Sequence, residues 1–268
     1  MTTLFFHDRA SHGNSPAQPP LLPIDELLAP SARAYLVAKM VFDFITALAL
    51  LILTGPLILG AMLLVKLTSP GPMLYTQTRL GRRGRPFTIY KIRTMMHDCE
   101  KASGARWSTP GDPRVTPVGA FLRKTHLDEL PQLWNVLRGD MSLIGPRPER
   151  PEFAPRLEQA VPHYRQRLAV RPGVTGLAQV QLPPDSDLAS VRIKTAYDLH
   201  YIRTIGVLLD VRIAWATLFK LLGLPYGRLR TLLLLPPRSV IEEGYRRLHV
   251  DEAITPAAER RQGSAHGT

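Results

Sequence analysis

One uninterrupted apolar segment limits what this chain can fold into more than any other feature of the sequence. Residues Phe44–Val65 read FITALALLILTGPLILGAMLLV and contain no charged side chain. A helix of about 20 apolar residues is long enough to cross the hydrocarbon core of a bilayer. The core helix of a soluble protein normally keeps a polar face, which this segment lacks. The segment therefore predicts a membrane-embedded helix, which we place at residues 35–67.

The middle of the segment and its flanks bear on how the helix lies in the membrane. Gly55 and Pro56 interrupt it, and a proline inside a helix produces a break or a kink. Positive charge marks the cytoplasmic side of a membrane. Basic residues flank both ends, namely Arg33, Lys39, Lys66, Arg79, Arg82, Arg83 and Arg85. A re-entrant helix that bends at Gly55–Pro56 and leaves by the face it entered satisfies both flanks, and a kinked spanning helix is the alternative.

The rest of the chain predicts a mainly helical α+β protein. Residues 73–79 and 86–92 have β character and flank a Gly/Arg loop, which predicts a small β-hairpin. Residues 188–223 predict one or two amphipathic helices suited to lying at a membrane interface. We divide the chain into a flexible N-terminal extension at 1–34, the membrane helix at 35–67, the main domain at 68–224, and a partly disordered C-terminal extension at 225–268.

The net charge indicates the kind of partner, and the cysteine count excludes two kinds of site. The net charge is +12, which predicts an anionic partner such as a nucleic acid, an anionic membrane face or a phosphorylated substrate. Cys99 is the only cysteine, so the chain has neither an intrachain disulfide nor a cysteine metal cluster.

An acidic pair, Asp128 and Glu129, lies in the stretch THLDELPQLWNVLRGD. Thr125 and Asp128 fit a capping box, which would make Asp128 a helix cap only. In that register Pro131 would fall in the second helical turn, where proline is costly. If Asp128 itself begins the helix, Pro131 falls in the first turn, where its missing N–H is not needed. The pair would then lie at the positive end of a helix dipole, which favours ionised carboxylates and attracts phosphate.

Basic residues near the pair favour a phosphate site over a structural role. A carboxylate at a helix start can bind a divalent cation or attack phosphorus. Arg147 is fixed between Pro146 and Pro148, and the planar fork of arginine suits phosphate oxygens. Further basic side chains come from the neighbouring segments, namely Lys91, Arg93, Arg123 and Arg138.

Three long stretches in the same order resemble the bacterial sugar transferases, the monotopic polyprenyl-phosphate phosphoglycosyl transferases. They are residues 69–95, residues 127–148 and the turn RPGVTGLAQV at 171–180, and the resemblance covers roughly residues 35–222. It implies transfer of a sugar 1-phosphate from a nucleotide sugar, expected to be a UDP-sugar, to a polyprenyl phosphate such as undecaprenyl phosphate. The products would be a lipid diphosphosugar and UMP, in the first membrane step of polysaccharide or glycoconjugate assembly.

The resemblance also implies roles for individual residues. Asp128 matches the family's nucleophile, which forms a phosphosugar–enzyme intermediate and is a ligand of the cofactor Mg²⁺. Glu129 matches its partner, which assists proton transfer or positions the acceptor. Lys91, Arg123 and Arg147 match positions near the substrate phosphates.

The resemblance further implies a location and a membrane geometry. Family members lie in the bacterial inner (cytoplasmic) membrane, in contact with membrane lipids and with the catalytic domain on the cytoplasmic face. Their re-entrant helix breaks at a Ser-Pro pair, where this chain has Gly55–Pro56, so we expect the Thr54 hydroxyl to bond the freed carbonyl instead. We also expect Tyr197 and Tyr201 to pack at the membrane face.

Two other classes of protein explain part of the sequence. A non-catalytic membrane-surface protein that binds anionic lipids would explain the apolar run and the arginines, but not a Pro-Arg-Pro loop after an acidic pair. A nucleic-acid binder would explain the charge, but the charge-free apolar segment argues against it, so we expect no nucleic acid as partner. The sequence does not determine the sugar, the glycan pathway or the oligomeric state.

Overall fold

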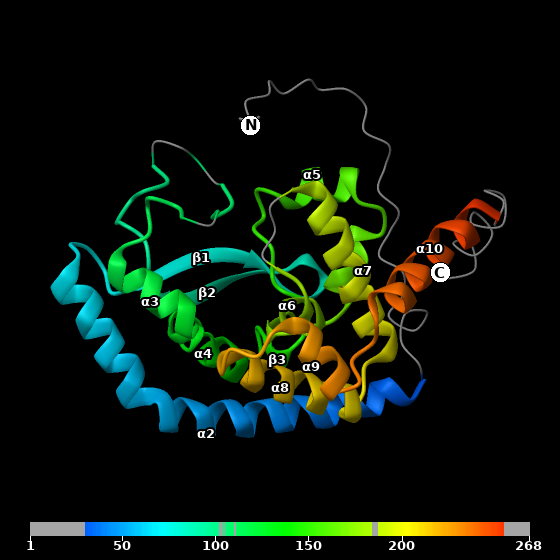
Figure 1. The fold of residues 1–268 in the computed structure, drawn as a ribbon, viewed down its shortest axis with the longest axis horizontal. Coiled ribbons are helices and arrows are strands. Elements are labelled where there is room, and N and C mark those ends of the chain that lie inside the picture. Colours follow the sequence, from blue (N-terminus) through cyan, green and yellow to red (C-terminus); the bar gives the residue numbers. More distant parts are fainter. Residues whose placement is uncertain (1–29, 102–103, 105, 110, 184–186, 255–268) are drawn as a thin grey trace, which may run out of the picture.

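The computed structural model describes residues 30–101, 104, 106–109, 111–183 and 187–254. These residues form a mainly helical α+β protein, as predicted (Figure 1). They contain two small sheets, of which the sequence predicted only the hairpin. The helices are α2 (Pro30–Thr68), α3 (Pro117–Thr125), α4 (Gln132–Leu137), α5 (Ala154–Ala160), α6 (Leu177–Gln181), α7 (Leu188–Thr204), α8 (Val207–Leu221), α9 (Tyr226–Leu232) and α10 (Arg238–Ile254). Three short 3-10 helices are η1 (Arg82–Gly84), η2 (Leu127–Glu129) and η3 (Tyr164–Ala169). The strands are β1 (Leu74–Leu80), β2 (Pro86–Ile92), β3 (Ser142–Ile144) and β4 (Gly173–Thr175).

Helix α2 contains the apolar segment and is, by length and composition, able to cross a membrane. It is one continuous helix with Pro56 inside it, and Figure 1 shows it bent along the lower edge of the molecule. Its buried residues recur at helical spacing from one end to the other: Ala32, Lys39, Asp43, Ala47, Ile58, Ala61 and Val65. One face of the whole helix therefore packs on the rest of the protein. Large apolar residues on other faces are exposed along the same length, among them Val41, Phe44, Ile52, Leu59 and Leu67.

The bend in α2 has a local cause. Pro56 has no N–H to donate to the carbonyl of Ile52, which opens the helix at this turn. The Thr54 hydroxyl donates to the carbonyl of Leu50 (2.7 Å), and such back-bonding also bends helices. The expectation that Thr54 bonds the freed carbonyl is wrong, because its short side chain reaches only the carbonyl four residues before it.

Buried polar contacts attach the first half of α2 to the domain. Lys39 Nζ lies 2.7 Å from the carboxylate of Asp210 on α8 and 3.3 Å from that of Asp43. Ser142 on β3 donates to Asp43 (2.5 Å), and the Tyr35 hydroxyl donates to Asp210 (2.6 Å). Because these groups are paired with one another, the charges are tolerated in the interior and fix the angle at which α2 meets the domain.

The two sheets differ in strand direction and in how well the sequence predicted them. Strands β1 and β2 form the predicted antiparallel hairpin, with Leu74 opposite Ile92 and η1 in the connection. Strand β4 pairs in parallel with β3, although the sequence predicts only a turn at residues 171–176. A three-residue strand is too short to show alternation, so it is defined only by its distant partner.

The main core lies where α7, α8 and α10 meet the sheet of β3 and β4. Tyr197 and Tyr201 are almost fully buried there, and the Tyr201 hydroxyl donates to Asp210 (2.9 Å) and to the carbonyl of Ile144 (3.1 Å). The expectation that these tyrosines pack at the membrane face is wrong, because both side chains are buried in the protein core. Tyr245 of α10 joins the same core. The predicted extensions at 1–34 and 225–268 lie only partly outside the described residues. Residues 30–34 belong to α2, and residues 226–232 and 238–254 form α9 and α10.

Candidate active site

The acidic pair lies in a turn between two helices. Helix α3 ends at Thr125, whose hydroxyl donates to the carbonyls of Phe121 and Leu122, so it forms no capping box. His126 then adopts a left-handed conformation (φ 56°) and turns the chain. Such a residue commonly ends a helix.

The sequence predicted that Asp128 begins a helix, and this prediction is wrong. The left-handed turn places Asp128 and Glu129 in the separate 3-10 helix η2. Helix α4 starts only after Pro131, which occupies the position before its first residue. The helix thus begins three residues later than predicted, and Pro131 precedes it, where its missing N–H is still not needed.

Asp128 is a buried carboxylate with little solvation. Its exposed fraction is 7%, and its side chain accepts no hydrogen bond from any described residue. Burial, together with the negative charge of Glu129, raises the pKa of Asp128 to about 6, while Lys91, Arg123 and Arg147 act in the opposite direction. The group is thus ionised at neutral pH but weakly solvated, as expected for a nucleophile.

Glu129 is fully engaged by two cations. Its Oε1 accepts hydrogen bonds from Lys91 Nζ and from Arg147 Nη2, each at 2.8 Å. Burial alone would raise the pKa of Glu129, but the charges and hydrogen bonds of Arg147 and Lys91 outweigh it and hold the pKa well below its usual range. The two neighbouring carboxylates therefore differ: Glu129 is held by two cations, whereas Asp128 accepts no hydrogen bond from a described residue.

Arg123 carries a positive charge without an acidic partner among the described residues. Its Nε donates to the Thr94 hydroxyl (2.9 Å) and its Nη1 to the Ser108 hydroxyl (2.8 Å). Both partners are neutral, so they orient the guanidinium without neutralising it. An oriented, uncompensated arginine near Asp128 is suited to phosphate oxygens.

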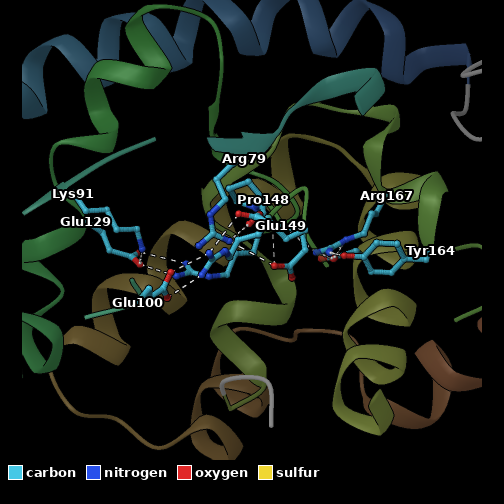
Figure 2. A network of polar contacts seen from close by, with 12 residues as sticks. Arg79, Lys91, Glu100, Glu129, Pro148, Glu149, Tyr164 and Arg167 are labelled. Carbon is cyan, nitrogen blue, oxygen red and sulfur yellow. Dashed lines mark hydrogen bonds and ion pairs between the residues drawn. The ribbon is translucent and has the colours of Figure 1, made fainter. Parts of the chain in front are cut away.

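The loop that carries Arg147 is held by its backbone. Arg167 donates to the Arg147 carbonyl (2.9 Å) and is itself paired with Asp198 (2.6 Å). Arg79 donates to the Pro148 carbonyl (3.0 Å). Figure 2 shows this polar network, with Lys91 and Glu129 together at one side and Arg167 beside Tyr164 at the other. Arg147 is therefore presented from a fixed backbone.

The base of this loop depends on a close approach of two glycines. The Gly173 N–H donates to the Pro146 carbonyl (2.8 Å), and the Gly145 N–H donates to the Thr175 carbonyl (2.9 Å). A Cβ on Gly173 would lie 2.1 Å from the Gly145 nitrogen. No side chain fits between these backbones, so both positions require glycine.

Gly173→Ala is expected to lower the free energy of unfolding by about 3 kcal/mol, because the new methyl group must separate β4 from Gly145. The same change should reduce activity through displacement of the Arg147 loop. Thermal unfolding of the purified protein would measure the first effect. The matched control is Gly244→Ala on α10, where a Cβ meets open space and should add up to about 1 kcal/mol. Equal unfolding temperatures for Gly173→Ala and wild type would contradict the close approach.

Several residues that position the site were not found from the sequence. Asn135 is fully buried on α4, donates to the Thr88 carbonyl (2.7 Å) and accepts from the Tyr90 N–H (3.2 Å). It thereby joins α4 to β2 next to Lys91. One polar residue inside an apolar helical stretch was the available signal. Nothing in the spacing of Arg167 and Asp198 predicted that they would meet.

Two of the basic residues that the sequence suggested for the phosphate site make other contacts. Arg93 donates to the carbonyls of Ser69 and Pro70, and so holds the turn that follows α2. Arg138 pairs with Asp140 at 3.2 Å.

The side chains at the site fit a magnesium ion only in a limited way. Among the described residues there is no group of three His, Cys, Asp or Glu side chains placed to hold a metal. The carboxylate of Glu129 is occupied by Lys91 and Arg147, which leaves Asp128. Mg²⁺ is commonly bound by one or two carboxylates together with substrate phosphates and water. Asp128 therefore fits an ion shared with the substrate, and the cofactor stays a prediction.

Comparison with known proteins gives a consistent family. The family model described as "Bacterial sugar transferase" matches residues 34–223. The UDP-N-acetylgalactosamine-undecaprenyl-phosphate N-acetylgalactosaminephosphotransferase of Aeromonas hydrophila is 43% identical over 188 residues, which are 70% of this chain and 44% of that protein. The exopolysaccharide production protein PSS of Rhizobium leguminosarum bv. phaseoli is 42% identical over 187 residues, 68% of this chain and 94% of that protein.

A third relative has a different sugar in its name. The UDP-glucose:undecaprenyl-phosphate glucose-1-phosphate transferase of Caulobacter vibrioides is 45% identical over 186 residues, which are 69% of each chain. The chain thus spans less than half the length of the Aeromonas protein but most of the Rhizobium protein.

Proposed function

Because the chain belongs to the bacterial sugar transferase family, we propose that it transfers a sugar 1-phosphate from a UDP-sugar to undecaprenyl phosphate. The Aeromonas and Caulobacter relatives carry this type of reaction in their names. The observation that best supports the proposal is the contrast within the acidic pair: Asp128 is buried and without a hydrogen-bond partner, beside a Glu129 that two cations neutralise.

In the first step, the carboxylate of Asp128 attacks the phosphorus joined to the sugar. An Oδ–P bond forms, the P–O bond to the uridine phosphate breaks, and UMP leaves with the electron pair. Arg123 binds the phosphate oxygens with the charge that its neutral partners leave free. Arg147 and Lys91, whose charges also act on Asp128, contribute further positive charge. Positive charge that is already in place stabilises the negative charge that develops during transfer.

In the second step, an oxygen of the lipid phosphate attacks the same phosphorus. The Oδ–P bond breaks, Asp128 regains its carboxylate, and the lipid diphosphosugar leaves. Glu129 positions the cations in both steps, because its salt bridges to Lys91 and Arg147 keep them beside Asp128. A magnesium ion held by Asp128 would supply further charge neutralisation at the substrate phosphates.

The proposed function is tested with purified protein, a set of UDP-sugars, Mg²⁺ and undecaprenyl phosphate. We expect release of UMP and a lipid-linked product, each dependent on both substrates. A non-catalytic lipid-binding protein would release no UMP with any sugar nucleotide. Comparing UDP-glucose with UDP-N-acetylgalactosamine identifies the sugar, which differs between the names of the relatives.

The pKa of Asp128 predicts the acid limb of the pH profile. Since the protonated carboxyl is not nucleophilic and the pKa of Asp128 is about 6, kcat/KM should fall below pH 6, about tenfold per pH unit. Arg123 lowers this pKa, so Arg123→Gln should move the inflection to higher pH. Initial rates from pH 4.5 to 8.5 would measure both. An inflection near pH 4 in the wild type would argue against Asp128 as the nucleophile.

We propose that α2 is re-entrant, so that the protein is monotopic on the cytoplasmic face of the inner membrane. The buried face of α2 runs from Ala32 to Val65, so both halves pack on the same domain. A spanning helix would carry one half to the opposite side, away from that domain. The exposed apolar residues of α2 would then enter one leaflet, and the basic residues at both ends would stay on the same side.

Cysteine labelling tests the topology of α2. We expect exposed cysteines at Ala34 and at Thr68, each introduced into a Cys99→Ser background, to react with an impermeant reagent from the same side of sealed vesicles. Glu158→Cys on α5 reports the side of the domain. Labelling of positions 34 and 68 from opposite sides would mean that the helix spans.

A further inference from the structure

A cavity lies between the first half of α2 and the domain. The apolar part of its wall includes Leu36 and Met40 of α2 and Ile205 after α7. The basic part includes Arg82 of η1 and Arg171 before β4. The hairpin connection, α7 and the membrane helix therefore meet at this cavity, although they are far apart in the sequence.

The two arginines in the cavity wall have no anionic partner. The side chain of neither Arg82 nor Arg171 forms an ion pair or hydrogen bond with any described residue. The Arg82 Nε is buried and lacks an acceptor. Burial, and then the positive charges of Arg83 and Arg171, lower the pKa of Arg82. A buried, unpaired N–H group and two mutually repelling cations are both unfavourable unless an anion is bound.

The acid in the cavity wall does not compensate these charges. Asp43 is the carboxylate in the wall, and it already accepts hydrogen bonds from Lys39 and from Ser142. Lys39 is also paired with Asp210. Lys39 thus faces two carboxylates, which leaves a single surplus negative charge. That surplus offsets at most one of the two arginines, so Arg82 and Arg171 still leave the cavity with excess positive charge.

The apolar wall of the cavity continues onto the proposed membrane surface of the protein. Met40 lines the cavity and is also 45% exposed. Val37 and Val41, its neighbours on α2, are 66% and 59% exposed. A ligand that binds its anionic group at the arginines can therefore lay apolar chains along α2. Arginine clusters beside apolar helices are suited to lipid head groups of this kind.

We propose that this cavity binds the phosphodiester head group of an anionic membrane phospholipid, with Arg82 and Arg171 donating to the phosphate oxygens. The wall contains neither Asp128 nor Glu129, so this ligand is distinct from the lipid acceptor of the proposed reaction. The bound lipid would join η1 and the segment before β4 to α2, and so hold the domain against the membrane. The inference goes beyond the proposed reaction and does not depend on it, but it rests on the proposed position of α2 in the membrane.

Ligand-induced stabilisation of the full-length protein in detergent tests the site. Phosphatidylglycerol, phosphatidylcholine, inorganic phosphate and undecaprenyl phosphate are titrated separately while Tm is recorded, because a ligand that binds the folded state raises Tm. We expect a saturable rise with phosphatidylglycerol and none with phosphatidylcholine. Arg82→Gln combined with Arg171→Gln should raise the apparent Kd for phosphatidylglycerol about tenfold or more, since two charge-assisted contacts are lost. The matched control is Arg85→Gln, an exposed arginine next to η1, which should bind as the wild type does.

Each of the other outcomes overturns the proposal. Equal responses to the two phospholipids would mean no head-group site. Saturation by inorganic phosphate at the same concentration would identify a free-anion site, and tighter binding of undecaprenyl phosphate that is lost with the two arginines would identify the acceptor site.

Arg82→Lys with Arg171→Lys keeps the charges and should retain most of the binding, so a general folding defect is separated from loss of the site.

Discussion

Asp128→Asn is expected to reduce sugar-phosphate transfer by about 1,000-fold or more, because the amide cannot form the bond to phosphorus. Release of UMP in the presence of undecaprenyl phosphate measures this loss. The matched control is Asp140→Asn, twelve residues later, whose carboxylate pairs with Arg138 and should be dispensable for chemistry. If Asp128→Asn retained wild-type turnover, the covalent mechanism through this residue would be wrong.

The same substitution should make the protein more stable. The pKa of Asp128 is about 6 in the folded protein, against an ordinary value of 3.8, so ionisation opposes folding. That penalty develops between pH 3.8 and pH 6 and is complete at neutral pH. Asparagine removes it, which predicts a gain of up to about 3 kcal/mol at pH 7.5, and no gain at pH 3.5 where Asp128 is protonated. A variant that is both inactive and more stable would separate a chemical role from a structural one.

Glu129→Gln is expected to have the opposite effect on stability. The substitution removes the carboxylate that the cations of Lys91 and Arg147 share and leaves these cations close together. This should lower the free energy of unfolding by about 3 kcal/mol. Activity should fall about 100-fold as well, because Arg147 and Lys91 lose the group that fixes them beside Asp128. Chemical unfolding and UMP release measure the two effects. The control is Glu152→Gln, whose carboxylate is 54% exposed and pairs with Arg150, so the change should stay below about 1 kcal/mol.

The pH dependence of the unfolding free energy and a double-mutant cycle both test this prediction. The pKa of Glu129 is depressed in the folded protein, so its contribution is present above its ordinary value of 4.5 and is lost as pH falls through the folded pKa. Lys91→Met in the Glu129→Gln background should restore part of the stability, because one buried cation is removed. Additive effects of the two changes would show that the ion pair makes no net contribution.

The sequence alone determined the elements whose signal is local. The charge-free run Phe44–Val65 predicted the long apolar helix, since composition over one segment is enough to define it. The β character of the segments on both sides of a Gly/Arg loop predicted the hairpin of β1 and β2. Long motifs in a fixed order predicted the family, which the match over residues 34–223 shows. The same motifs named Asp128, Glu129 and their cations, and these do lie together.

The tertiary structure decided what depends on contacts between distant segments. The left-handed conformation of His126 places Asp128 in η2 and not in α4. Burial and the neighbouring charges of the folded protein raise the pKa of Asp128 and lower that of Glu129. Strand β4 exists only because β3 lies beside it. The pairing of Arg167 with Asp198 joins residues 31 positions apart. Neither periodicity nor spacing encodes these contacts, because each depends on how several elements pack.

The apolar segment shows the same division. Its length and lack of charge were sufficient to predict a helix that belongs in a membrane, because transfer of apolar side chains from water depends on composition. They did not determine which face of that helix meets protein. Only the folded chain shows that buried residues from Ala32 to Val65 run along one face of a bent but continuous α2. Packing of both halves against one domain is a tertiary property, and it is the observation that favours a re-entrant helix over a spanning one.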